Sequence, residues 1–251
     1  MKIRIISIFL IIPLLLSSCW KEEADHVPVP PNRTILFYMA GDNSLGDETQ
    51  EKIDALAAAW NVGGNSHLLV YQDRGEEYMP RLLEVKTGTD GKGTVEVLEE
   101  YKDENSASFK VFTRVLNDMV RYCPGSDYGL VVFSHSSGWL PTGTFAQPRS
   151  VVTDRDTEFD LIDFARAIPN GQFRFIVFES CLMAGAEVAY ELKDKTGYIL
   201  PPVPKSFHRA SRPCMAGCLR NSIKPHPTSP GLPVSITSTV TGSPVTTVRL
   251  R

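Results

Sequence analysis

A cysteine and a histidine each follow an apolar run in which a buried strand is expected. Cys181 comes directly after FRFIVFES, residues 173–180, and His135 ends YGLVVFSH, residues 128–135. A thiolate is a strong nucleophile, and an imidazole can exchange a proton near neutral pH. Either residue alone is more often structural, since a cysteine can pack as a small hydrophobe. Together, in this order and 46 residues apart, they predict a cysteine–histidine pair for acyl transfer.

Strands and helices alternate along the chain, and this order predicts an α/β domain with a mostly parallel sheet and helices on both faces. In such sheets, chemistry collects at the carboxyl ends of the strands. The second helix-like stretch after His135 is expected to begin at Cys181, and its N-terminus would favour the thiolate. Strands are expected at 34–42, 67–73, 128–135, 173–180 and 196–200, a hairpin at 81–100, and helices at 45–60, 106–124, 158–169 and 181–194.

The chain contains, in this order, TILFYMAGDNSL, FSHSSGW, RSVVTDRDTEFDLIDFARAI and FESCLMAGAEVAYEL. These four stretches resemble the clostripain-like cysteine peptidases, a bacterial family with a caspase-like fold. TILFYMAGDNSL resembles the opening strand of that family, FSHSSGW its histidine motif, and FESCLMAGAEVAYEL its cysteine motif with the following helix. RSVVTDRDTEFDLIDFARAI resembles the segment between the two motifs. The resemblance covers about residues 33–200 and implies a caspase-like α/β fold, with a mostly parallel sheet flanked by helices.

The resemblance implies a catalytic dyad that cleaves after Arg or Lys. Cys181 would be the nucleophile and His135 the proton donor, while the N–H groups of Cys181 and of Ser136 or its neighbours would form the oxyanion hole. Glu179 would face the basic side chain of the substrate, although it could equally be an ordinary polar residue at a strand end. The family commonly has Gly where this chain has Ser136, and Asp where it has Glu179.

A maturation site is expected between the two catalytic motifs. Family members are often cut there, and Arg149 and Arg155 stand in a predicted exposed loop with the required basic side chains. Self-cleavage at one of these two arginines is therefore expected.

The N-terminus has the pattern of a lipoprotein signal. Lys2 and Arg4 precede an apolar run at 5–16, and Leu16-Ser17-Ser18-Cys19 resembles the bacterial lipobox, in which the cysteine is lipidated after cleavage. The alternative is a plain signal peptide or membrane anchor. Residues 1–18 are thus expected to be removed, Cys19 to carry lipid, and 19–33 to form a Pro-rich tether to a peptidase domain at 34–200. The expected location is the bacterial cell envelope.

Charge is divided unevenly between this domain and the rest of the chain. Residues 1–200 hold all 29 acidic and 19 of the 26 basic residues, and 201–251 hold seven bases, nine Pro and thirteen Ser or Thr. The acidic body offers no basic stripe, which argues against nucleic acid as a partner. The switch in composition falls inside the strand expected at 196–200. It indicates a chain truncated or frame-shifted near residue 200 and inactive as written, unless 201–251 is a native disordered tail.

Metal, cofactor and disulfide patterns are weak. Cys123 and Cys181 could pair in an exported protein, but nothing in their spacing requires it. No Gly-x-Gly-x-x-Gly follows a strand, so a dinucleotide cofactor is not expected. Neither of two metal-like patterns has the required spacing: an acidic loop suggestive of calcium (Asp154, Asp156, Glu158, Asp160) and a zinc-like set (His208, Cys214, Cys218, His226). The other function that remains open is a surface lipoprotein that keeps the fold but only binds.

Overall fold

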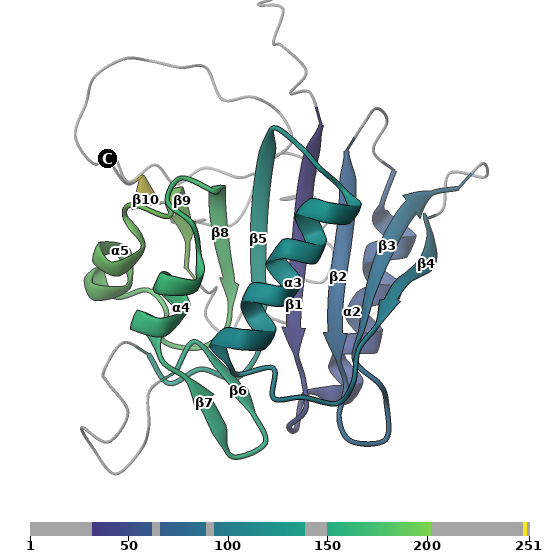
Figure 1. The fold of residues 1–251 in the computed structure, drawn as a ribbon, viewed down its shortest axis with the longest axis horizontal. Helices are drawn as coiled ribbons and strands as arrows, with labels where there is room; N and C mark the ends of the chain where they lie inside the picture. Colours follow the sequence, from purple (N-terminus) through teal and green to yellow (C-terminus); the bar gives the residue numbers. More distant parts are fainter. Residues whose placement is uncertain (1–31, 62–65, 89–92, 139–149, 202–247, 250–251) are drawn as a thin grey trace, which may run out of the picture.

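An eight-stranded, mostly parallel sheet forms the centre of the molecule (Figure 1). The structure is a computed structural model that describes residues 32–61, 66–88, 93–138, 150–201 and 248–249. The strand order is β10-β9-β8-β5-β1-β2-β3-β4, with parallel pairing from β9 to β2 and antiparallel pairing at both ends. The strands are β1 (Arg33–Ala40), β2 (His67–Asp73), β3 (Arg81–Thr87), β4 (Gly93–Glu100), β5 (Asp127–Phe133), β8 (Phe173–Glu179), β9 (Thr196–Leu200) and β10 (Val248–Arg249).

Helices cover both faces of the sheet, as the alternating pattern predicts. In Figure 1, α3 (Phe109–Tyr122), α4 (Leu161–Ala167) and α5 (Ala186–Leu192) lie in front of the sheet, and α2 (Gly46–Ala59) lies behind it. A small separate hairpin, β6 (Val152–Asp154) and β7 (Thr157–Phe159), stands near the carboxyl end of β1. The fold is therefore the caspase-like α/β arrangement that the sequence predicts.

The burial of the central strand β1 explains why the sequences of these strands are unbroken apolar runs. Every residue of β1 is buried, and its side chains alternate between two cores. Leu36 and Tyr38 pack in the core that also holds residues of α3, α4 and α5, whereas Ile35 and Phe37 pack in the core with α2. Because the strand is covered on both faces, no polar alternation remains in its sequence.

Two elements differ from the sequence-based expectation. The helix expected at 158–169 is shorter, because Thr157–Phe159 pairs as β7 and Asp160 caps α4 by accepting a hydrogen bond from the Ile162 N–H at 2.7 Å. The helix expected to start at Cys181 starts at Ala186 instead. A hairpin strand in the first case and a turn in the second take the first residues of the apolar pattern, and helical periodicity reveals neither.

The N-terminal and C-terminal segments are described only in part. The proposed signal at 1–18 and most of the tether lie outside the described residues, as does nearly all of 201–251. From that C-terminal segment, Val248 and Arg249 pair antiparallel with Ile199 and Tyr198 of β9, at the sheet edge. Within the part of the chain that is described, no helix has both the length and the apolar character needed to cross a membrane.

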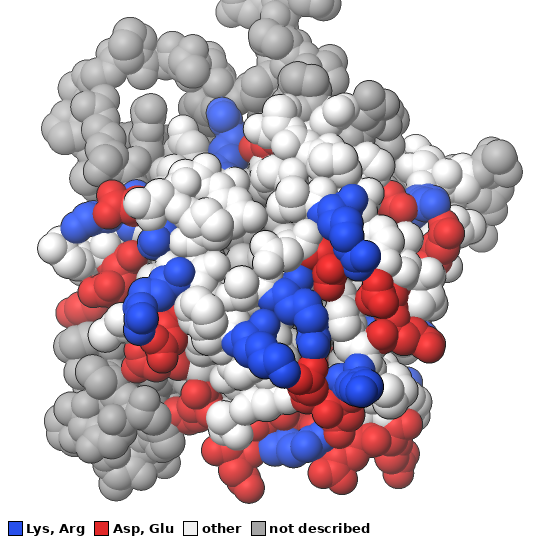
Figure 2. Space-filling view, viewed as in Figure 1, with Lys and Arg blue, Asp and Glu red and all other residues white. Residues whose placement is uncertain are grey.

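Charges of both signs are interspersed on the face that carries α3 and α4 (Figure 2). Lysine and arginine side chains alternate with acidic ones across this face, and acidic side chains gather along its lower edge. A continuous basic stripe, which a nucleic-acid-binding surface would need, is not visible among the described residues on this face.

Buried acids lie near the carboxyl ends of β1 and β2. Asp73 and Asp154 are both almost fully buried, and both accept hydrogen bonds from Ser106: the hydroxyl donates to Asp73 and the backbone N–H donates to Asp154. Burial is the main cause that raises the pKa of Asp73 to about 6, and the nearby carboxylate of Asp154 contributes. The charged form of Asp73 therefore costs folding free energy at neutral pH.

The Asp73→Asn variant is expected to be more stable than the native chain at pH 7. Since the pKa of Asp73 is raised in the folded state, its contribution to stability is full below pH 4 and is lost as pH rises to about 6. A shift of about two units corresponds to at most about 3 kcal/mol. Urea unfolding at pH 4 and pH 7 should show similar stabilities at pH 4 and a gain for the variant at pH 7. Asp47→Asn, at an exposed position, serves as the control; a loss of stability for Asp73→Asn at pH 7 would contradict the prediction.

Candidate active site

The two strands that lead to the predicted catalytic residues are neighbours in the sheet. β5 and β8 pair in parallel, and Phe133 lies opposite Glu179 at their carboxyl ends. His135 follows β5 by two residues, and Cys181 follows β8 by two residues. The sheet therefore brings both residues to adjacent positions on one edge, as the order of motifs predicts.

The loops that carry these residues touch each other. The Ser136 hydroxyl donates a hydrogen bond to the backbone carbonyl of Cys181. Gly138 has a φ of +105°, which favours glycine, and a Cβ there would lie 3.4 Å from the Cβ of Leu182. Leu182 itself has a φ of +58°. A left-handed residue directly after Cys181 turns the chain sharply, which explains why no helix begins at the cysteine.

His135 and Cys181 are not hydrogen-bonded to each other in this structure. The Nε2 atom of His135 lies 2.8 Å from the hydroxyl of Ser44, and the ring is exposed. Cys181 is a half-buried free thiol whose sulfur has no hydrogen-bond partner among the described residues. The contact with Ser44 uses Nε2, which leaves Nδ1 as the ring nitrogen for proton exchange with the thiol. Ser44 was not expected at the site from the sequence, although GDNSL belongs to one of the four motifs.

Two backbone N–H groups at these loops are available to a ligand. Across the described residues, neither the N–H of Ser136 nor that of Cys181 has a partner, whereas the N–H of Ser137 donates to the Ser150 carbonyl at 3.0 Å. Ser136 is not among the described non-glycine residues with positive φ, so its backbone does not need a glycine. Serine at this position therefore leaves the N–H group usable.

Glu179 already has a cationic neighbour. The Lys52 Nζ atom, from α2, lies 2.8 Å from Glu179 Oε2 but outside the angles of a hydrogen bond, so the contact is an ion pair. The same ammonium lies 4.5 Å from the centre of the Phe133 ring, which adds a cation–π contact. Glu179 is thus a mostly buried carboxylate whose charge is balanced from within the chain.

One predicted means of activating the thiol is wrong. α5 begins at Ala186 and has seven residues, so its N-terminus does not lie directly behind Cys181. Residues 181–184 form a turn instead. The dipole of α5 therefore does not account for a reactive thiolate, and the imidazole of His135 remains as the nearby group that could stabilise it.

Arg155 lies in a tight turn and not in the extended loop that a cleavage site would need. It occupies the turn between β6 and β7 with a φ of +49°, and its N–H donates to the Asp42 carbonyl at 2.7 Å. Its guanidinium donates to Asp42 at 2.6 Å and to Asp103 at 2.7 Å. Cleavage there would require the hairpin to open. Arg149 lies outside the described residues.

The weaker metal and disulfide patterns find no common site in the described chain. Cys123 and Cys181 are both free. Asp154 and Asp160 each accept a backbone N–H, from Ser106 and Ile162, so two carboxylates of the acidic loop already have local roles. The zinc-like residues of the C-terminal segment lie outside the described residues.

Comparison with known proteins identifies relatives of this arrangement. A family model described as the clostripain family matches residues 37–205. The chain is 33% identical to an inactive zymogen C11 protease from Parabacteroides distasonis, with a TM-score of 0.59 over 70% of this chain and 49% of that one. It is 30% identical to a secreted C11 cysteine protease from Bacteroides thetaiotaomicron bound to an irreversible peptide inhibitor, again with a TM-score of 0.59, over 68% and 48%.

The matches cover a larger share of this chain than of the solved structures. The chain spans about half the length of the two solved structures. A search of curated proteins found no match. The family match covers about two thirds of the chain and includes β5, β8 and both loops described above. This chain therefore belongs to the clostripain family.

Proposed function

We propose that this protein is a cysteine endopeptidase that cleaves after Arg or Lys through Cys181 and His135. The observation that carries the proposal is the adjacency of the loops after β5 and β8, which places both residues on one edge of the sheet. Family membership supports the reaction class, since both solved relatives are described as C11 proteases.

The proposed mechanism uses the Cys181 thiol, the His135 imidazole and two backbone N–H groups. The Cys181 thiolate attacks the scissile carbonyl carbon, and the N–H groups of Cys181 and Ser136 stabilise the oxyanion that forms. His135 gives its proton to the leaving amine, and then draws a proton from the water that hydrolyses the thioester. The contact between Nε2 and Ser44 leaves Nδ1 as the ring nitrogen that exchanges these protons.

Glu179 is the proposed binding group for the substrate's basic side chain. Its mostly buried carboxylate suits a guanidinium or ammonium group, but the ion pair with Lys52 occupies the same oxygen. A substrate cation would therefore have to displace Lys52, whose flexible chain is partly exposed.

Substitutions of the two residues are expected to change KM for arginine substrates in opposite directions. Glu179→Gln removes the charge that attracts the substrate and should raise KM roughly 10- to 100-fold. Lys52→Met removes the competing ammonium and should lower KM several-fold. Lys102→Met, an exposed lysine with no proposed role, serves as the control. If Lys52→Met leaves KM unchanged while Glu179→Gln destabilises the fold, Glu179 is a structural partner of Lys52.

An irreversible inhibitor provides the direct test of the proposed function. A peptide that ends in arginine and carries a thiol-reactive group is expected to label Cys181 once per chain, detected by intact mass and peptide mapping. A matching peptide that ends in glutamate should label much more slowly, because it lacks the positive charge. Equal labelling by both peptides, or none at Cys181, would contradict the proposal.

One observation favours a second candidate function, a surface lipoprotein that binds without cleaving. Among the described residues no hydrogen bond joins His135 to Cys181, and His135 Nε2 contacts Ser44 instead. If the imidazole does not reach the thiol when a peptide is bound, the site would hold peptides without reacting. Binding of the arginine peptide without labelling of Cys181 would identify this function.

The cell envelope is the proposed location of the protein. One relative is described as secreted, which supports export; we propose in addition that Cys19 is lipidated and anchors the domain to the cell envelope. The Cys19→Ala variant would then leave the membrane fraction.

Arg149 is the better candidate for self-cleavage, because Arg155 is held in the β6–β7 turn.

A further inference from the structure

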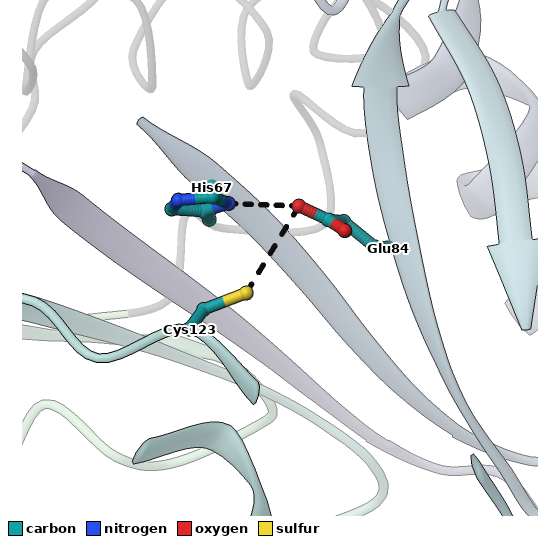
Figure 3. Close-up of side chains that lie close together, drawn as sticks. All are labelled: His67, Glu84 and Cys123. Carbon is teal, nitrogen blue, oxygen red and sulfur yellow. Dashed lines mark hydrogen bonds and ion pairs between the residues drawn. The ribbon is translucent and has the colours of Figure 1, made fainter. Parts of the chain in front are cut away.

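Three side chains with metal-binding atoms lie close together near the amino ends of β2 and β5, opposite the carboxyl ends of the strands that lead to His135 and Cys181. They are His67, the first residue of β2, Glu84 in β3, and Cys123, which follows α3. His67 Nδ1 lies 2.7 Å from Glu84 Oε1, and Cys123 Sγ lies 3.9 Å from the same oxygen. All three donor atoms lie within 4.8 Å of one another (Figure 3).

The backbone holds these three residues in place without any ligand. The Cys123 N–H donates to the Met119 carbonyl at 2.9 Å, and its carbonyl accepts from the Thr34 hydroxyl at 3.0 Å. His67 and Glu84 stand on neighbouring strands of the sheet. Cys123 is 3% exposed and Glu84 9%, whereas the His67 side chain is 35% exposed. The cluster is therefore rigid and largely dry, with one side open to solvent.

We infer that His67, Glu84 and Cys123 form a binding site for Zn²⁺ or a similar divalent ion. Zinc takes imidazole nitrogen, thiolate sulfur and carboxylate oxygen, and a water would complete a tetrahedral set. Ordinary zinc bond lengths would put the nitrogen and oxygen about 3.4 Å apart, and the oxygen and sulfur about 3.5 Å apart. The nitrogen–oxygen separation would lengthen by about 0.7 Å and the oxygen–sulfur separation would shorten by about 0.4 Å. The nitrogen–sulfur separation, within 4.8 Å, would shorten by up to about 1.2 Å.

Charge balance supports an ion at this place. A thiolate and a carboxylate together neutralise Zn²⁺, which makes the occupied site neutral and suited to a largely buried position. Burial and the neighbouring Glu84 raise the pKa of Cys123 to about 12, so the metal must release the thiol proton when it binds. The positive charge of Lys86 disfavours metal binding, since its Nζ atom lies 3.4 Å from Glu84 Oε2. That contact leaves Oε1 to face the histidine and the cysteine.

Titration of the purified full chain with Co²⁺ tests this site. Tetrahedral cobalt bound through a thiolate is expected to give a charge-transfer absorption that saturates at one ion per chain and that Zn²⁺ removes. Cys123→Ser should abolish this absorption, and His67→Gln should weaken binding by at least about tenfold. Lys86→Gln should strengthen it several-fold. Circular dichroism of each variant shows whether it has folded.

The other cysteines of the chain provide the controls. Cys181→Ala and the double variant Cys214→Ser/Cys218→Ser should keep the absorption, because neither changes a proposed ligand. Zn²⁺ should also raise the Tm of the native chain more than that of His67→Gln. An absorption that survives in folded Cys123→Ser, one that is lost only in the double variant, or a Tm that Zn²⁺ raises equally in both proteins would overturn the inference.

Discussion

In any active form of the protein, Cys181→Ala and His135→Ala are each expected to abolish hydrolysis of reporter peptides with Arg or Lys before the cleaved bond. Cys181 supplies the attacking sulfur and His135 the proton for the leaving amine, so loss of either group removes a required step. Each variant should lose at least about 10³-fold in kcat/KM, and the double variant should lose little more than either single one, because the two act as a unit.

The matched controls are chosen to separate chemistry from folding. Cys218→Ser removes a thiol that has no proposed part in cleavage and should leave kcat/KM unchanged. Ser44→Ala removes the hydroxyl that contacts His135 Nε2 and is expected to lower kcat/KM less than His135→Ala does, because the imidazole itself remains. Activity of Cys181→Ala that thiol reagents fail to inhibit would show that another nucleophile is used. Loss of activity in Ser44→Ala with an unchanged Tm would show that Ser44 positions the imidazole for catalysis.

Phe112→Ala is expected to lower the free energy of unfolding by about 3–5 kcal/mol. Phe112 is fully buried on the inner face of α3, and its ring packs edge-on against Tyr38 at 5.0 Å between ring centres. It also packs against Phe164 of α4 at 4.8 Å and Phe159 of β7 at 5.7 Å. Because this one ring joins the sheet to two separate elements, truncation would leave a cavity that the surroundings cannot readily fill.

Phe109→Ala on the same helix is the matched control. Phe109 begins α3 but is 47% exposed, so its truncation should cost less than about 1 kcal/mol. Urea unfolding followed by circular dichroism measures both variants under the same conditions. Equal losses for the two variants would mean that the packing around Phe112 is not as the structure places it.

The apolar pattern of each segment is enough to predict which segments form the sheet and which cover it. β1, β2, β5 and β8 follow the predicted apolar runs to within about two residues at each end. Periodicity is a local property, so a strand buried on both faces is visible in its own residues. Parallel strands joined by right-handed crossovers end on the same edge, and this rule is enough to predict that His135 and Cys181 lie next to each other.

The boundaries near the site depended on turns that periodicity does not describe. CLMAGAEVAYEL has the apolar spacing of a helix from its first residue, yet the chain turns at Leu182 and enters α5 at Ala186. At this turn Leu182 lies close to Gly138, which is 44 residues earlier in the sequence: a Cβ on Gly138 would lie 3.4 Å from the Leu182 Cβ. A left-handed residue that packs against a distant loop leaves no signal in its own neighbourhood.

The contacts of each site residue follow from the tertiary structure and not from local sequence patterns. Ser44 meets His135 across 91 residues, Lys52 of α2 meets Glu179 of β8, and His67, Glu84 and Cys123 come together from three elements. Side-chain contacts of this kind depend on how helices and loops pack over the sheet, and single-sequence patterns record spacing within an element but not packing between elements. The sequence could therefore name Cys181, His135 and Glu179, but not the partners that set their charge and orientation.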